Sequence, residues 1–142
     1  MRILAVDSGE KRLGIALSDP SGTIATPLTI LEHVSRLIDA AVIAALAAQH
    51  EAERIIVGQS LDMDNQPTPQ GRRAARLAGA IQSQTNLPVE LWDEWGSTQA
   101  ARSAHMVMGG SARQRRQRGH GHLDDLAATY ILQSYLDAHT QP

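Results

Sequence analysis

The sequence contains no cysteine and no phenylalanine, and each absence limits what the protein can be. Without cysteine it has no disulfide, no thiolate zinc site and no cysteine nucleophile, so oxygen or imidazole must hold any bound metal. Aromatic residues make up only 3% of the 142 residues, so Leu, Ile, Val and Ala must fill the core. The remaining composition, 42% hydrophobic and 20% charged, is typical of a folded globular chain.

Long hydrophobic runs are also missing. The longest apolar run covers residues 40–48, far fewer than the ~20 residues that span a bilayer. The chain opens directly with a strand pattern and lacks a charged and then apolar leader, so we expect a cytoplasmic protein with no membrane association. With 142 residues and no internal repeat, we expect one domain over 1–142.

Charge is nearly balanced overall but unevenly distributed. The formal net charge is −2, and Lys11 is the only lysine of the chain. Four arginines fall in one stretch without acids. They are Arg113, Arg115, Arg116 and Arg118. Because basic side chains bind phosphates by releasing counterions whatever the sequence, this stretch predicts a nucleic-acid contact.

The hydrophobic pattern predicts an α/β fold. Three antiparallel strands open the chain, and after them strands and helices alternate, which requires a parallel portion of the sheet. The predicted strands cover 2–6, 13–19, 22–31, 53–58 and 88–93, and the predicted helices 34–50, 70–85, 97–108 and 123–138. In the first helix, Ser35 is the expected cap. Apolar residues at helical spacing predict its packed face: Leu37, Ile38, Ala41, Val42, Ala45 and Leu46.

Three acids stand at the ends of predicted elements and face a common region. Asp7 follows the first strand, Glu94 follows the fifth, and Asp124 lies four residues before Ala128 in the apolar stripe of the last helix. Hard divalent cations bind carboxylates and water, and phosphodiester cleavage by such ions needs carboxylates on rigid elements. Oxygen-only acids together with basic segments therefore suggest a nuclease.

Each acid taken alone has a simpler explanation. Asp7 with the two residues after it fits an ordinary hairpin turn. Asp124 or Asp125 fits a helix N-cap or a favourable partner of the helix dipole. The argument for a site therefore depends on the three acids occurring together.

Other polar residues are better explained without a site. His120 and His122 have a spacing that suits a metal, but they fall in a Gly- and Arg-rich segment, 109–122, that we expect to be mobile and solvated. Asp62 and Asp64 lie in the loop 59–69, where acids usually meet water. Three arginines on one side of the second helix favour a solvated face over a phosphate contact. These are Arg72, Arg73 and Arg76.

Four blocks of sequence, in order, carry a resemblance over nearly the whole chain. They read VDSGEKRLGIALSD (6–19), IVGQSLDMD (56–64), DEWGST (93–98) and LDDLAATYILQSYL (123–136). In these blocks the chain resembles the YqgF/RuvX-like family of the RNase H-like superfamily. The resemblance implies an RNase H-like fold, with a five-stranded mixed sheet in the order 3-2-1-4-5 flanked by helices. Its acidic positions fall on Asp7, Glu94 and Asp124, which would bind Mg²⁺ or Mn²⁺.

The resemblance also implies an activity. Family members are assigned to processing the 5′ end of the 16S ribosomal RNA precursor during ribosome biogenesis, and Holliday-junction resolution is the other activity proposed for them. Lys11 and Arg12, beside Asp7, are the candidates for holding the scissile or adjacent phosphate. We therefore predict a metal-dependent endonuclease acting on structured RNA, as a monomer or a weak homodimer.

The third block departs from the family pattern, which usually continues with Arg and a bulky apolar residue. Trp95 and Gly96 stand there instead, and an indole cannot grip phosphate bidentately as a guanidinium does. Trp95 either stacks on a nucleobase, contributing ~1–3 kcal/mol, or only covers the end of the sheet.

Three alternatives stay open. A resolvase acting on branched DNA would favour a stable two-fold dimer. A catalytically weak RNA-binding module fits the missing arginine, but clustered carboxylates repel phosphate unless a cation intervenes. A nucleotide-binding ATPase ranks last, because 142 residues leave no second lobe to close over ATP.

Overall fold

The computed structural model describes residues 1–93 and 120–140, with side chains up to residue 93 and from 126 to 139. Five strands form a mixed sheet in the order β3-β2-β1-β4-β5. β1 (Ile3–Ser8) and β2 (Arg12–Ser18) are antiparallel, as are β2 and β3 (Ala25–Glu32). β4 (Arg54–Gln59) lies parallel to β1, and β5 (Val89–Asp93) parallel to β4. This arrangement confirms the predicted α/β fold and the sheet order that the resemblance implied.

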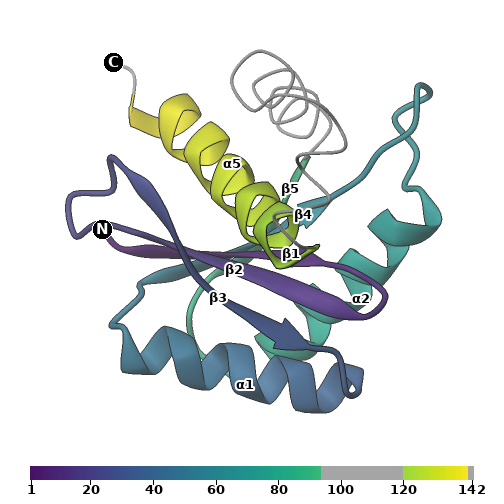
Figure 1. Cartoon of the computed structure of the whole chain (residues 1–142), viewed down its shortest axis with the longest axis horizontal. Helices are drawn as coiled ribbons and strands as arrows, with labels where there is room; N and C mark the ends of the chain where they lie inside the picture. The colour runs from purple at the N-terminus through teal and green to yellow at the C-terminus, as the bar shows by residue number, and fades with distance from the viewer. Residues whose placement is uncertain (94–119, 141–142) are drawn as a thin grey trace.

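Helices cover both faces of the sheet (Figure 1). α1 (Arg36–Gln49) and α2 (Pro69–Gln82) lie on one face, and α5 (His120–Thr140) lies on the other. Successive strand side chains alternate between these two layers. On β1, Leu4 and Val6 join the core with α1 and α2, whereas Ile3 and Ala5 pack with α5. The central strand is therefore buried on both faces, which is why its sequence is apolar without strict alternation.

The buried face of α1 differs from the predicted one. The buried residues are Asp39, Ala40, Ile43 and Ala47. Of the predicted stripe, Leu37 is 67% exposed, Ile38 49% and Val42 38%. This helix is apolar on nearly all sides, so helical spacing alone is compatible with more than one choice of buried face. The prediction failed because the observed face is fixed by the buried carboxylate of Asp39, which bonds to residues preceding the helix.

The starts of α1 and α2 follow ordinary capping. Ser35 is the cap of α1, as predicted, and its Oγ accepts from the Ile38 N–H at 3.2 Å. Thr68 caps α2, and its Oγ1 accepts from the Gly71 N–H at 3.0 Å. α2 ends at Gln82, before the predicted end at residue 85. The Ser83 hydroxyl bonds back to the Ala80 carbonyl at 2.7 Å, a local bond that favours helix ends.

Helix α5 has the predicted apolar stripe but starts earlier. Ala128, Ile131, Leu132 and Tyr135 are all buried, as expected. The helix begins at His120, so the predicted start at residue 123 is wrong. Asp124 consequently lies in the second turn, and its interpretation as an N-cap is wrong.

The predicted helix over 97–108 and the four arginines of the basic stretch lie outside the described residues. Within the part of the chain that is described, no helix is long and apolar enough to cross a membrane.

Candidate active site at the carboxyl end of β1

Asp7 lies near the carboxyl end of β1, on the face of the sheet that α5 covers. Ala5 packs with α5, and Asp7, two residues further along the strand, points to the same side. Strand β1 continues through Ser8, and Asp7 pairs with Gly14 of β2. The hairpin-turn interpretation of Asp7 is therefore wrong. The turn comes after it, where the Gly9 N–H donates to the Arg12 carbonyl at 2.9 Å.

Glycines stand beside Asp7 on both neighbouring strands. Gly14 is its partner on β2, and Gly58 follows Val57, which pairs with Val6, on β4. Cross-strand neighbours on one face normally crowd each other with their side chains. Here neither neighbour carries a side chain, so the half-buried carboxylate of Asp7 has backbone on both sides. This arrangement suits the close approach of an ion or a phosphate.

The other two predicted ligands are the residue after β5 and a residue in the early turns of α5. Asp93, the last residue of β5, pairs with Gln59 at the carboxyl end of β4. Glu94 comes next and lies outside the described residues, as does Trp95. The backbone of Asp124 lies in α5, four residues before the buried Ala128. The described side chains contain no group of three acids or histidines that could hold a metal ion.

Two cations lie next to the end of β1. Arg12 begins β2 and is exposed. Because Leu13 points into the core under α1 and α2, Arg12 lies on the face of Asp7, as a diagonal neighbour within reach of a long side chain. Lys11 is exposed in the turn, and its carbonyl accepts from the His33 N–H at 2.9 Å.

The acidic loop after β4 has a structural explanation. Asp62 Oδ1 accepts from the N–H groups of Asp64 and Gln66, both at 2.9 Å. Asn65 has a φ of 58°, which an asparagine tolerates better than most residues. Asp62 therefore shapes the turn, and both loop acids are exposed to water, as predicted.

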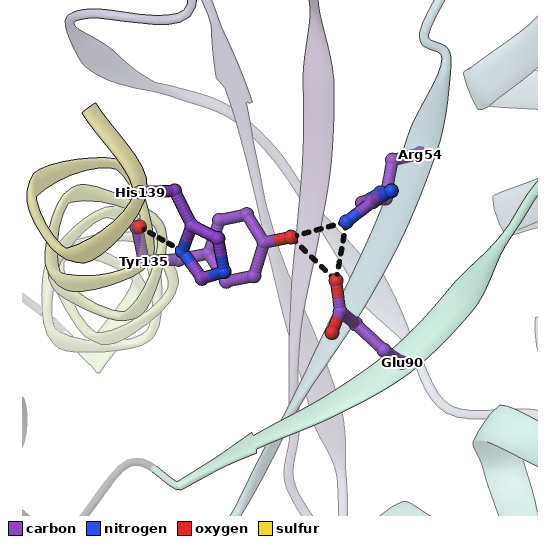
Figure 2. A network of polar contacts seen from close by, with 4 residues as sticks. All are labelled: Arg54, Glu90, Tyr135 and His139. Atoms are coloured by element: carbon purple, nitrogen blue, oxygen red, sulfur yellow. Dashed lines mark hydrogen bonds and ion pairs between the residues drawn. The ribbon is translucent and has the colours of Figure 1, made fainter. Parts of the chain in front are cut away.

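A polar network at the opposite end of the sheet holds α5 in place (Figure 2). Arg54 Nη1 donates to Glu90 Oε1 at 2.8 Å and to the Tyr135 hydroxyl at 2.6 Å, and that hydroxyl donates to Glu90. Burial, and then the bond to Glu90, raise the pKa of Tyr135. The hydrogen bond with Tyr135 raises the pKa of Arg54. The network joins α5 to the amino ends of β4 and β5.

Aromatic contacts reinforce this end of α5. The rings of Tyr135 and His139 stack with centroids 4.0 Å apart, and Trp92 of β5 meets Tyr135 edge-on at 5.1 Å. Since the late turns of α5 lie over the start of β4, its first turns point toward the carboxyl ends of the parallel strands. The network was missed in the sequence, although Arg54 and Glu90 at the starts of two strands could have suggested an ion pair.

The sheet order and the placement of the helices define an RNase H-like fold, and similar solved structures share it. The chain is similar to RuvC from Thermus thermophilus (TM-score 0.55, 13% identity, 97% of this chain and 95% of that one). It is also similar to the fowlpox virus resolvase in complex with Holliday junction DNA (TM-score 0.58, 14% identity, 99% and 100% covered). At these identities the likeness shows the fold alone.

Sequence comparisons give the family. The model described as "RuvX: Holliday junction resolvase" matches residues 1–138. A "Putative pre-16S rRNA nuclease" of Syntrophus aciditrophicus is 39% identical over 141 residues, covering 99% of this chain and 91% of the relative. One from Myxococcus xanthus is 34% identical over 142 residues, covering 100% and 91%.

The chain belongs to the RuvX family. Its members are nucleases, enzymes that hydrolyse phosphodiester bonds, and nucleases of this fold generally depend on divalent metal ions.

Proposed function

We propose that the protein is a metal-dependent endonuclease that processes the 5′ end of the 16S ribosomal RNA precursor. The observation that supports this proposal most directly is the half-buried Asp7 at the carboxyl end of the central strand, between Gly14 and Gly58. The relatives named as pre-16S rRNA nucleases match nearly the full length of this chain, which favours RNA as the substrate.

Asp7, Glu94 and Asp124 would hold Mg²⁺ or Mn²⁺ in this proposal. Their donor set fits, because hard cations prefer carboxylate oxygen and the chain has no thiolate to attract a softer metal. When bound, the ion lowers the pKa of a water molecule and offsets charge on the phosphate. The strand pairing with Gly14 fixes the backbone of Asp7, and the network around Tyr135 fixes the helix that carries Asp124.

Basic residues around this edge would hold the nucleic acid. Arg12, on the same face as Asp7, and Lys11 in the adjoining turn would bind the scissile or neighbouring phosphate. The arginine stretch, Arg113, Arg115, Arg116 and Arg118, would contact the backbone over a longer range, and Trp95 would stack on a base. We expect the protein to be cytoplasmic and to act as a monomer or a weak homodimer.

Resolution of Holliday junctions is the second candidate. The family description and the likeness to a resolvase solved with junction DNA favour it. Such an enzyme cuts two opposed strands, so a stable two-fold dimer in solution would support this candidate over the first. A catalytically weak RNA-binding module, the remaining candidate, would bind RNA but leave it intact.

One experiment tests these candidates together. The purified protein is incubated with a 16S precursor fragment and with a four-way DNA junction, each with Mg²⁺, Mn²⁺ or a chelator. We expect metal-dependent cleavage of the RNA. We expect Asp7→Asn to abolish it with little change in folding or RNA affinity, because the substitution removes charge at similar volume.

Neighbouring acids of the last helix supply the control. Asp124→Asn should match the defect of Asp7→Asn, whereas Asp125→Asn should have little effect, because residue 124 shares the register of Ala128. Cleavage at the wild-type rate by folded Asp7→Asn would refute the site. Equal defects in Asp124→Asn and Asp125→Asn would refute the choice between them.

A further inference from the structure

A cavity of about 220 Å³ lies on the face of the sheet opposite to Asp7. It is bordered by the end of β1, the start of α1 and the first half of α2. Ser8 follows Asp7 directly, but its side chain points to the other face, the face of Val6 and Leu13. Three arginines line the cavity. They are Arg36 of α1 and Arg73 and Arg76 of α2.

Ser8 lines this cavity and carries a hydroxyl group without a hydrogen-bond partner in the described structure. The residue is 3% exposed, and its Oγ has no hydrogen-bond partner within the described part of the chain. A buried hydroxyl without a partner is destabilising, so such groups call for a ligand or a functional explanation. The backbone carbonyl of Ser8 is already bonded to Gln70 Nε2 at 3.2 Å, which fixes the start of α2 against the end of β1.

The arginines give the cavity a positive charge. Among the described residues, the guanidinium groups of Arg36 and Arg76 have no ion pair or hydrogen bond. Arg73 has a long ion pair, 3.6 Å, with Glu10, whose side chain is 80% exposed. Asp39 also lines the cavity, but its carboxylate is already bonded to His33 Nδ1 at 2.5 Å and to the Val34 N–H at 3.1 Å.

The position of these charges on α2 is unfavourable without an anion. The first turn of α2 contains no acidic residue and is followed closely by Arg72 and Arg73. Backbone N–H groups at a helix start carry partial positive charge, so cations there are repelled and anions attracted. Arg72 relieves part of this repulsion by donating to the Pro67 carbonyl at 3.1 Å. Arg73 and Arg76 line the cavity instead. The sequence analysis favoured a solvated face over a phosphate contact for these arginines.

We propose that this cavity binds a phosphate group. The Ser8 hydroxyl donates a hydrogen bond to a phosphate oxygen, and Arg36, Arg73 and Arg76 neutralise its charge. Ser8 and Asp7 are consecutive residues of the central strand, so the cavity and the candidate active site lie on opposite faces of one sheet edge. A nucleic-acid strand crossing that edge presents phosphates to both. This last step rests on the proposed function, whereas the binding of phosphate does not.

The test is a titration of the full chain, followed by NMR at the Ser8 amide and the arginine side chains. One arm uses inorganic phosphate, and the other a short single-stranded oligonucleotide without terminal phosphates. We expect shifts at Ser8 and Arg76 in both arms. The oligonucleotide is then added to the protein that already holds inorganic phosphate. Displacement of the phosphate identifies a backbone phosphate as the ligand, and failure to displace it identifies a free phosphoryl compound. The absence of shifts at Ser8 and Arg76 in both arms would overturn the proposal.

Variants separate binding from a structural role. Ser8→Ala and Arg76→Gln should each weaken phosphate binding about tenfold, as expected for loss of a hydrogen bond or ion pair to a charged ligand. Arg72→Gln, on the same helix but outside the cavity, should change the affinity less than about twofold. Ser8→Ala should melt no lower than wild type, because the hydroxyl it removes has no partner. Unchanged affinity in both cavity variants would refute the site.

The two proposals can fail separately. Phosphate binding with no cleavage of RNA or DNA would remove the nuclease assignment and leave the cavity site. Metal-dependent cleavage that needs Asp7, with no phosphate bound at Ser8, would do the reverse.

Discussion

Replacing Gly71 by alanine should destabilise the protein, although alanine is the better helix former. A Cβ at position 71 would lie 2.2 Å from the carbonyl oxygen of Ser60. Nonbonded heavy atoms pack at roughly 3.5 Å, so α2 or the Ser60 carbonyl must move by about an ångström. The same carbonyl accepts from the Thr68 N–H and from the Thr68 hydroxyl, both at 3.1 Å, so the movement also weakens the helix cap.

The expected change in the free energy of unfolding combines two destabilising contributions and one stabilising contribution. Overpacking costs about 1–3 kcal/mol, and the weakened hydrogen bonds add up to about 1 kcal/mol. The helix propensity of alanine returns at most about 1 kcal/mol. We therefore expect the free energy of unfolding to fall by about 2 kcal/mol. Gly79 is the matched control on the same helix: a Cβ there meets nothing within 4 Å, so Gly79→Ala should stabilise by about 0.5–1 kcal/mol.

Urea denaturation measures both variants. The two midpoints should move in opposite directions from that of the wild type, with the slope of the transition unchanged. Equal stability of Gly71→Ala and Gly79→Ala would refute the close approach of α2 to the Ser60 carbonyl.

Three further predictions concern the network, a surface turn and the basic stretch. Tyr135→Phe removes the hydroxyl between Arg54 and Glu90 and should lower the free energy of unfolding by about 1–3 kcal/mol, measured in urea; wild-type stability would contradict a role in holding α5. Hydrogen bonds from the Ser21 hydroxyl and from the Ile24 and Thr23 N–H groups lower the pKa of Asp19 from 3.8 to about 2. Its contribution to stability is therefore present above pH 3.8 and lost as the pH falls toward 2, and the carboxyl carbon should titrate in NMR near 2, not near 3.8. Changing the four arginines between 113 and 118 to alanine should make the slope of log affinity against log salt shallower by ~0.7 for each phosphate of a single strand that the variant no longer neutralises, and an unchanged slope would exclude a role of these arginines in binding the backbone.

Local sequence was a good guide to the elements and a poor guide to their contacts. The strands were recognisable because β-branched and apolar runs are bounded by turn residues, as in residues 53–58. The end of β1 was misplaced because pairing with β2, and not composition, carries that strand through Ser8. The face of α1 was misplaced because Ile43 and Leu37 are equally apolar, and only the tertiary bonds of Asp39 distinguish the two sides.

Some residues of the candidate site could also be predicted from the sequence, whereas others could not. Asp7 could be singled out because an acid after an apolar strand is conspicuous, and the register then places it between two glycines. The cavity lined by arginines could not be predicted, because Arg36, Arg73 and Arg76 come to line one cavity only after α1 and α2 pack together. The roles of Glu94 and Asp124 beside Asp7 stay predictions.

Helix α5 ties the last part of the described chain to its first strands. The Gln133 side chain accepts from the Ala25 N–H and donates to the Thr23 carbonyl, across separations of 108 and 110 residues. Until this helix is synthesised, the sheet residues that pack against it lack its cover. The buried apolar sheet residues that pack with α5 are Ile3, Ala5, Ala16, Ala25 and Ile56. The native packing of these residues is therefore completed only after α5 has been synthesised, and transiently exposed apolar surface of this kind favours aggregation.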